Sequence, residues 1–124
     1  MPLLLEKESF AIRGAVFDVY KELGCGFLEA VYQECLEIEL ARKEIPFISQ
    51  PKLQIQYKNK TLKQIYKPDF ICFGKIIMEL KATKNIDPVH KAQTLNYLKA
   101  TQAPLALLIN FGSHPKVQIE RLLI

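Results

Sequence analysis

Apolar residues recur at helical spacing in the first third of the chain and at strand spacing in the middle. A helix is predicted over residues 9–23, with Ser9 as its N-cap and Gly24-Cys25-Gly26 as its end. The apolar stripe of this helix consists of Ile12, Val16, Val19 and Leu23.

A second helix is predicted over residues 27–43, before a break at Pro46. Glu29 falls in its first turn, where the helix dipole favours an acid, and the same position would also let its carboxylate reach a site. The expected core stripe consists of Leu28, Val31, Cys35 and Ile38, widened by Tyr32, Leu36 and Leu40.

The middle of the chain alternates polar and apolar residues, which predicts a run of three or four antiparallel strands. A half-buried strand is expected over residues 52–57, with a turn at 58–60 and a returning strand over 62–66. Pro68 indicates an edge or bend before a further hairpin over residues 69–81.

The last third predicts one helix and two strands. Asp87-Pro88 is typical of a helix start, and the helix is expected to run to Thr101. The apolar run over residues 105–109 predicts a central, buried strand parallel to its neighbour, and a final strand is expected over 117–124. The whole order predicts an α/β sandwich around a mixed sheet.

The hairpin over residues 69–81 carries charges in an apolar setting. Glu79 and Lys81 are two residues apart and share a strand face. If the hairpin turns through three residues centred on Gly74, Asp69 lies opposite Glu79 on that face. Two carboxylates and one ammonium then meet, and a divalent cation would balance them. Exposed edge-strand charges are the alternative, which the apolar flanks make less favourable.

The helix expected after Pro88 also carries polar residues on one side. His90, Gln93 and Tyr97 share a stripe at spacings of three and four, and we expect this stripe to face the charged cluster. The opposite stripe, which we expect to contact the core, consists of Val89, Ala92, Leu95 and Leu98.

Composition indicates a single globular domain over residues 1–124, with 49% hydrophobic and 24% charged residues. The run Leu3-Leu4-Leu5 is too short for a signal peptide, and no apolar run would span a membrane, so a cytoplasmic protein is expected. The three cysteines lack metal-ligand spacing, and we expect them to be buried as small apolar residues.

The net charge of +4 is less informative than its distribution. The segment from Lys52 to Lys67 contains no acid, and it leads directly to Asp69. A solvated strand face is the ordinary interpretation, and a footprint on a phosphate backbone is the functional one. The candidate nucleic-acid-binding residues are Lys52, Lys58, Lys60, Lys63 and Lys67.

Taken together, Asp69, the Glu79-x-Lys81 segment and the Gln93-x-x-x-Tyr97 segment resemble the PD-(D/E)xK nuclease superfamily. The segment Gly26-Phe27-Leu28-Glu29-Ala30-Val31-Tyr32 matches the motif of the GxxExxY protein family, which is assigned to the same superfamily. The likeness runs from about Ile12 to the C-terminus, and it implies a restriction-endonuclease-like core.

The resemblance also implies roles for individual residues. Asp69 and Glu79 correspond to metal-ligand carboxylates, with the carbonyl of Leu80 as a further ligand of Mg²⁺ or Mn²⁺. Lys81 corresponds to the group that orients or activates the attacking water. Glu29 corresponds to an acid that binds metal directly or through water, and Gln93 and Tyr97 to residues that support the site or contact phosphate.

The favoured function is therefore a metal-dependent nuclease that hydrolyses phosphodiester bonds, with DNA preferred over RNA as the expected partner. A binding module for nucleic acid or for a protein, which keeps the fold without turnover, is the alternative. A scaffold in which the acids serve only structure is a third hypothesis, against which the complete Asp, Glu and Lys set argues. A chain this small leaves little surface for reading sequence, so backbone recognition, a homodimer or a protein partner is expected.

Overall fold

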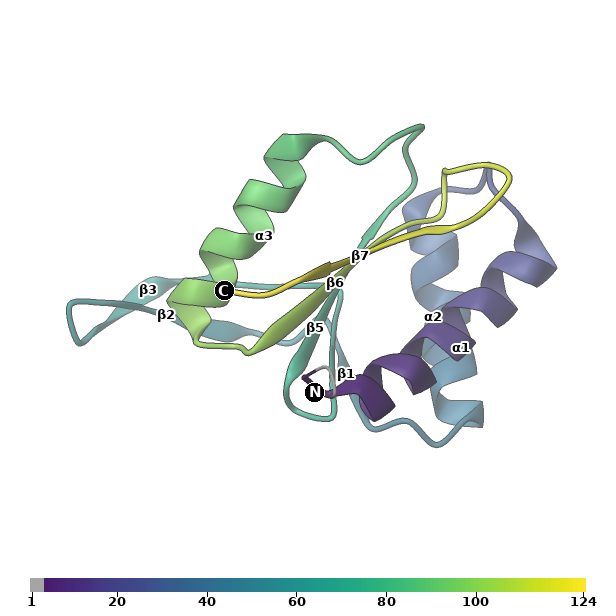
Figure 1. Cartoon of the computed structure of the whole chain (residues 1–124). Coiled ribbons are helices and arrows are strands. Elements are labelled where there is room, and N and C mark those ends of the chain that lie inside the picture. Colours follow the sequence, from purple (N-terminus) through teal and green to yellow (C-terminus); the bar gives the residue numbers. More distant parts are fainter. Residues whose placement is uncertain (1–3) are drawn as a thin grey trace.

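The computed structural model describes residues 4–124, so Leu3 of the short leucine run lies outside the described range. Helices and strands follow in the order shown in Figure 1. The elements are α1 (Glu6–Leu23), α2 (Glu29–Arg42), β1 (Phe47–Ser49), β2 (Leu53–Tyr57), β3 (Lys60–Tyr66), β4 (Phe70–Cys72), β5 (Ile76–Lys81), α3 (Pro88–Thr101), β6 (Leu105–Asn110) and β7 (Gln118–Leu122).

A five-stranded sheet with the strand order β1-β4-β5-β6-β7 runs through the middle of the molecule. β5 and β6 are parallel and joined through α3, whereas the other neighbouring strands are antiparallel. Every residue of β6 is buried, which confirms the predicted central parallel strand. The fold is thus the predicted mixed sheet flanked by helices.

The β4–β5 hairpin has the register that parity predicted. Phe70 pairs with Met78, and Cys72 pairs with Ile76, which leaves a loop of three residues centred on Gly74. Gly74 has a φ of 67°, the left-handed conformation expected for glycine in such a loop. The preceding Phe73 also has a positive φ of 56°.

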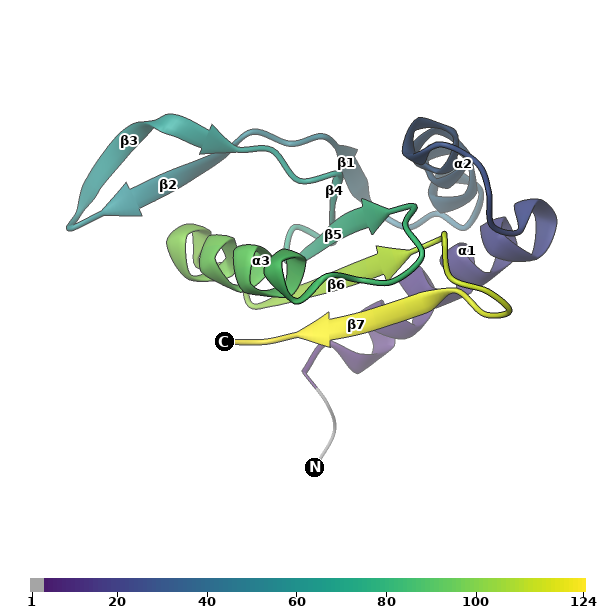
Figure 2. The same ribbon diagram turned by 90° about the horizontal axis from the view of Figure 1, so that it is seen from above.

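Alternation along β5 separates two packing faces. Met78 and Leu80 pack in one cluster with α1 and α2, whereas Ile77 packs with Leu98 of α3. Figures 1 and 2 show α1 and α2 on one side of the sheet and α3 on the other. Because side chains two apart share a face, Glu79 lies on the α3 side with Ile77.

The predicted cap of the first helix is wrong. α1 begins at Glu6, with Leu5 as its N-cap, and Ser9 lies within the helix with 4% of its surface exposed. Ser9 precedes Ile12 and Val16 by three and seven residues, so it belongs to the buried stripe. The first turn of α1, before Ser9, was not predicted because Leu5 provides no side-chain cap.

The predicted core stripe of the second helix is only partly correct, because the residues expected to widen it form the buried face. Leu28 and Ile38 are 78% and 57% exposed, and the buried face consists of Tyr32, Leu36 and Leu40. Apolar residues occupy two adjacent stripes of this helix, so periodicity alone does not fix its rotation. The Tyr32 ring stacks on Phe111 with 4.3 Å between centroids, and this contact orients the helix.

The helix after Asp87 begins as predicted, because the Asp87 carboxylate accepts from the N–H of Val89 over 2.9 Å. Its expected core stripe is only partly correct. Val89 is 66% exposed and Ala92 is exposed, whereas Thr94 and Leu98 are buried.

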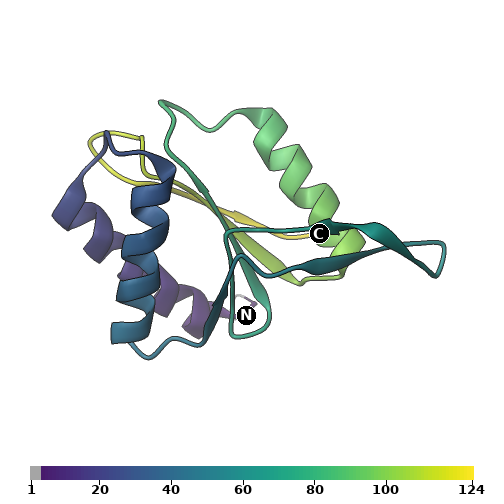
Figure 3. The same cartoon turned by 180° about the vertical axis from the view of Figure 1, so that it is seen from behind.

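The predicted antiparallel strands are present but belong to two sheets, because the β2–β3 hairpin forms a sheet of its own. β1, for which no strand was predicted, occupies the edge next to β4. Pro51 and Pro68 flank the hairpin and lack the N–H needed to continue a strand ladder. Figure 3 shows the hairpin extending away from the body of the molecule on the side of α3.

Gly112 is required where the chain leaves β6. A Cβ at this position would overlap the Thr83 carbonyl oxygen and lie 2.7 Å from the carbonyl carbon of Ala82. We expect Gly112→Ala to lower the free energy of unfolding by about 3 kcal/mol, because backbone must move. Chemical denaturation measures the change. Gly14→Ala is the control: a Cβ there meets nothing within 4 Å, and the expected effect is a gain of about 0.5–1 kcal/mol. Equal effects of the two substitutions would contradict this account.

The cysteines differ in environment. Cys72 is buried, and burial raises the pKa of its thiol to about 12. Cys35 is half-buried and Cys25 is exposed, so the expectation of burial is wrong for Cys25, which lies in the loop after α1. Among the described residues, no helix combines the length and apolar character needed to cross a membrane.

Candidate active site

Asp69 and Glu79 lie beside each other where β4 and β5 meet. The N–H of Asp69 donates to Glu79 Oε1 over 3.1 Å, and the N–H of Leu80 donates to Asp69 Oδ2 over 2.6 Å. Each carboxylate therefore uses one oxygen to hold the other strand. The second oxygen of each makes no hydrogen bond within residues 4–124, which leaves both oxygens available to a ligand.

The main chain at Asp69 is held by residues that the sequence did not single out. Gln33 on α2 donates through Nε2 to the Asp69 carbonyl over 3.0 Å and to Ser49 Oγ over 2.9 Å. The N–H of Gln50 donates to the same carbonyl over 2.8 Å. The only signal for Gln33 in the sequence is its position four residues after Glu29, on the same helix face.

Burial makes both carboxylates harder to ionise. Burial first, and then the charge of Asp69, raises the pKa of Glu79 to about 7. Burial also raises the pKa of Asp69, opposed by the hydrogen bond from Leu80 and increased again by the charge of Glu29. Lys81 lowers the pKa of both carboxyls, but less than burial raises it. The pair is therefore electrostatically strained and would be relieved by a cation.

Tyr66 places a buried hydroxyl beside Glu79, and sequence reasoning missed it. The side chain is 6% exposed, and its oxygen has no hydrogen-bond partner among the described residues. Burial, followed by the charge of Glu79, raises the pKa of this hydroxyl, so it stays protonated at neutral pH. Glu79 acts on this hydroxyl through its charge, and the two groups do not form a hydrogen bond.

Tyr97 reaches the site through Tyr66. The two rings stack with 4.1 Å between centroids and 6° between planes. His90 is half-buried, and its Nδ1 is buried without a partner in the described chain. Gln93, in contrast, is exposed to solvent. Of the three residues predicted to face the charged cluster, Tyr97 packs against Tyr66, whereas Gln93 is open to solvent.

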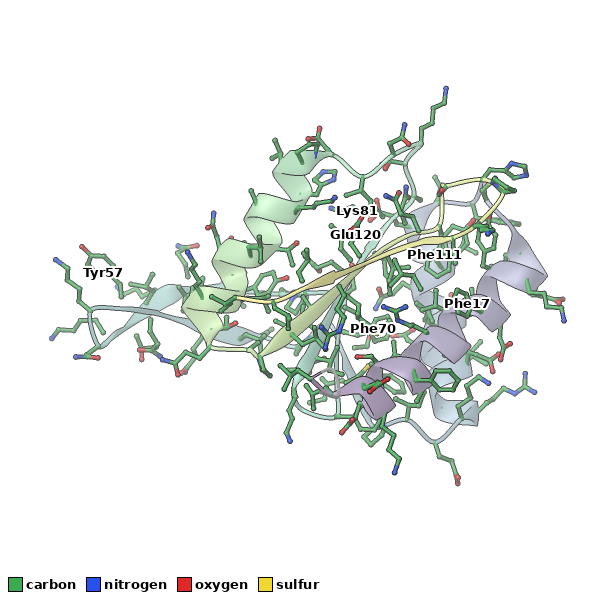
Figure 4. All side chains as sticks on the ribbon, in the orientation of Figure 1. Phe17, Tyr57, Phe70, Lys81, Phe111 and Glu120 are labelled. Atoms are coloured by element: carbon green, nitrogen blue, oxygen red, sulfur yellow. The ribbon has the colours of Figure 1, made fainter. Side chains whose placement is uncertain are left out.

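Lys81 lies at the end of β5, in the body of the molecule (Figure 4). It is half-buried and forms no ion pair within residues 4–124. It pairs in parallel register with Asn110, whose Oδ1 accepts from the N–H groups of Thr83 and Gly112, each over 3.0 Å. Asn110 thus ties together the chain segments that follow β5 and β6 and fixes the strand end that carries Lys81.

Glu29 begins α2 and lines an open pocket of about 440 Å³ together with Asp69. The loop before it is closed by Tyr32, which is fully buried. The Tyr32 hydroxyl donates to the Gly24 carbonyl over 2.5 Å and accepts from the N–H of Phe27 over 3.3 Å. The spacing from Gly26 to Tyr32 therefore has a structural basis: the tyrosine fixes the turn that presents Glu29.

The donor set can be compared with what Mg²⁺ or Mn²⁺ requires. Within residues 4–124, no three carboxylate, imidazole or thiol side chains gather closely enough to hold a metal ion. Mg²⁺ is commonly bound by one or two carboxylates and keeps several waters. The adjacent carboxylates of Asp69 and Glu79, with one uncommitted oxygen each, fit that requirement. Glu29 lines the same pocket as Asp69.

The five candidate lysines all lie on or beside the β2–β3 hairpin, and all are exposed. The hairpin ends at Tyr66, three residues before Asp69. Lys58 lies over the ring of Tyr57, with 5.5 Å from Nζ to the ring centroid. The basic surface therefore starts next to the carboxylate pair and continues to the hairpin turn.

Comparison with known proteins agrees with this fold. Residues 6–122 match the PD-(D/E)XK nuclease superfamily, and the chain belongs to that superfamily. Its mixed sheet with flanking helices is a restriction-endonuclease-like fold.

The crystal structure of SSO0001 is similar in fold, with a TM-score of 0.57 and 18% sequence identity. The match covers 76% of this chain and 48% of that one, so this chain spans about half the length of SSO0001. No curated protein matches the chain.

Proposed function

We propose that this protein is a nuclease that hydrolyses phosphodiester bonds of nucleic acid with Mg²⁺ or Mn²⁺, as a single domain over residues 1–124. The observation that carries the proposal is the Asp69–Glu79 pair, joined by two backbone hydrogen bonds and with one uncommitted oxygen each. Lys81 follows on the face of Glu79. Membership of the PD-(D/E)XK superfamily supports the same chemistry.

We assign the acidic residues of the site to metal binding and the basic residue to the attacking water. Asp69, Glu79 and the Leu80 carbonyl would hold the metal, and Glu29 would bind it directly or through water. The metal, when bound, supplies charge neutralisation and an acidic bound water. Lys81 orients the attacking water and stabilises the charge that develops near it. Tyr66, held by stacking on Tyr97, packs beside Glu79. Gln93 on α3 would contact phosphate.

We expect Asp69→Asn to abolish Mn²⁺ binding and hydrolysis, because the amide keeps the shape and the acceptor for Leu80 but removes the charge. Isothermal titration with Mn²⁺ and a cleavage assay in Mg²⁺ or Mn²⁺ measure the two losses. Glu34→Gln is the matched control, since Glu34 is an exposed acid in the same pocket as Asp69. If Asp69→Asn binds Mn²⁺ like the wild type, Asp69 is not a metal ligand.

A binding module without turnover is the second candidate. It is favoured by the absence of a three-residue ligand cluster in the described part of the chain. Wild-type protein that binds nucleic acid in a salt-dependent manner, but cleaves neither DNA nor RNA in either metal, would establish this alternative.

Assignment to the GxxExxY family is part of the proposal. The support is the structural use of that motif, in which Tyr32 closes the turn that presents Glu29. Tyr20 donates to the Ser113 carbonyl over 2.7 Å and so joins α1 to the loop before β7. The homodimer or protein partner expected from the sequence stays a prediction.

A further inference from the structure

The β2–β3 hairpin is a two-stranded ribbon with one packed face and one free face. Leu53, Ile55 and Tyr66 pack with α3 and the sheet. Gln54 pairs with Ile65 and, beyond a shift in register between Gln54 and Gln56, Gln56 pairs with Thr61. Gln54 and Gln56 alternate with Leu53 and Ile55, so they and their two partners form the opposite, outer face. Figures 2 and 3 show the ribbon extending beyond α3, away from the helices on the other side of the sheet.

The outer face is mostly polar, is flanked by lysines and is free of acids. Its residues, together with the two flanking lysines, are all exposed: Lys52, Gln54, Gln56, Thr61, Ile65 and Lys67. Thr61 Oγ1 donates to Gln56 Oε1 over 3.2 Å, which orients the amide and leaves its N–H groups pointing elsewhere. Lys58, Lys60 and Lys63 add charge at the turn and along β3. The complementary partner is a polyanion with hydrogen-bonding groups between its charges.

Two features of the hairpin favour duplex DNA over single strands and over duplex RNA as this polyanion. Binding of a single strand relies on aromatic rings on which bases stack, and the outer face carries none: Tyr66 is buried against Tyr97, and Tyr57 lies on the other face. The major groove of B-form DNA admits a two-stranded ribbon, whereas that of an A-form RNA duplex is too narrow and deep for side chains to read.

We propose that the outer face of the β2–β3 hairpin binds the major groove of B-form DNA, with the lysines on the flanking phosphates and the glutamines on base edges. The proposal rests on the proposed function and names its substrate class as duplex DNA. Glutamine amides pair with base edges in the major groove, and lysines contact phosphates without reading sequence.

The hairpin has the length and position for this role. The seven residues of β3 span about 20 Å, which corresponds to about six base pairs of duplex. Figure 4 shows Tyr57 at the far end of the ribbon and Lys81 in the body of the molecule. Because β3 ends three residues before Asp69, a duplex gripped by the ribbon continues toward the carboxylate pair.

Binding without cleavage tests the inference. Fluorescence anisotropy in EDTA compares a DNA duplex of about two helical turns with the matching RNA duplex and single-stranded DNA, over a range of salt. Wild type is expected to prefer the DNA duplex, and methyl green, which occupies the major groove, is expected to compete. The double variant Lys52→Ala with Lys67→Ala, which removes the two lysines that flank the outer face, should lose about tenfold in affinity and lower the salt slope by about 2.

A second variant tests the face itself. Gln54→Glu with Gln56→Glu keeps the shape of the outer face and places two negative charges on it, so duplex binding should fall at least as far. The control is Lys7→Ala with Lys21→Ala on α1, which changes net charge equally at exposed positions on the other side of the sheet. The control should bind like wild type, and all three variants should keep the wild-type thermal unfolding midpoint.

The outcomes separate this inference from the proposed nuclease activity. Hairpin variants that bind the DNA duplex like wild type, or a wild type that prefers RNA duplex or single strands, would overturn the inference even if the protein cleaves DNA. Loss of duplex binding in both hairpin variants, with an unaffected control, supports the inference even if no hydrolysis is found in Mg²⁺ or Mn²⁺.

Discussion

Replacing Lys81 by alanine is expected to reduce metal-dependent hydrolysis by about 10²–10³-fold while folding and metal affinity stay nearly unchanged. A protonated ammonium is a donor only and does not bind a metal. Its contribution should therefore arise in the transition state, where charge builds on the attacking water and the phosphate. The side chain makes no ion pair within residues 4–124, so its removal breaks no ion pair of the folded protein.

The measurement is a cleavage assay in Mg²⁺ or Mn²⁺, with calorimetric Mn²⁺ titration and thermal unfolding of the same variant. Lys75→Ala is the matched control, because Lys75 is an exposed lysine in the loop of the same β4–β5 hairpin. A Lys81→Ala protein that cleaves as fast as wild type would show that the role assigned to Lys81 is wrong, even for a protein that proves to be a nuclease.

Local rules predicted the fold best where one residue type dictates one geometry. Gly74 and strand parity predicted the register of β4 with β5, and Asp87-Pro88 predicted the start of α3. The continuous apolar run predicted β6 because a strand buried on both faces has no polar alternation. Long-range packing decided the rest, including the rotation of α2 and the separation of the β2–β3 hairpin from the main sheet.

The same division holds for the candidate site. The adjacency of Asp69 and Glu79 follows from hairpin parity, a relation over ten residues. The contacts of Gln33 with Asp69 and of Tyr66 with Tyr97 join segments about thirty residues or more apart, and no spacing rule connects them. Glutamine and tyrosine are also common away from sites, so their residue types gave no signal until the elements were placed.

Glu79 should make the metal-free protein less stable as pH rises. The unfolded carboxyl titrates near 4.5, whereas burial and the charge of Asp69 raise the pKa in the folded protein to about 7. Between these values the folded state binds more protons than the unfolded state. The free energy of unfolding therefore falls as pH rises from about 4.5 to about 7, and the loss persists above that range. A difference of about 2.5 pKa units corresponds to about 3 kcal/mol.

Glu79→Gln removes the ionisation and keeps an Oε1 acceptor for the Asp69 N–H. The variant should be more stable than wild type by about 2–3 kcal/mol near pH 8 in EDTA and nearly equal to it near pH 4. Urea denaturation across this pH range measures the difference, with Glu34→Gln as an exposed control that should track wild type at every pH.

Metal should reverse the order of stability. A cation that binds the ionised Asp69–Glu79 pair stabilises the folded wild type by mass action, and the gain should increase with pH because the proton on Glu79 competes with it. Saturating Mn²⁺ should therefore raise the unfolding free energy of wild type near pH 8 and leave Glu79→Gln nearly unchanged. If the unfolding free energies of wild type and Glu79→Gln have the same pH dependence in EDTA, folding does not raise the pKa of Glu79 as described. If both gain equally from Mn²⁺, it is not a ligand.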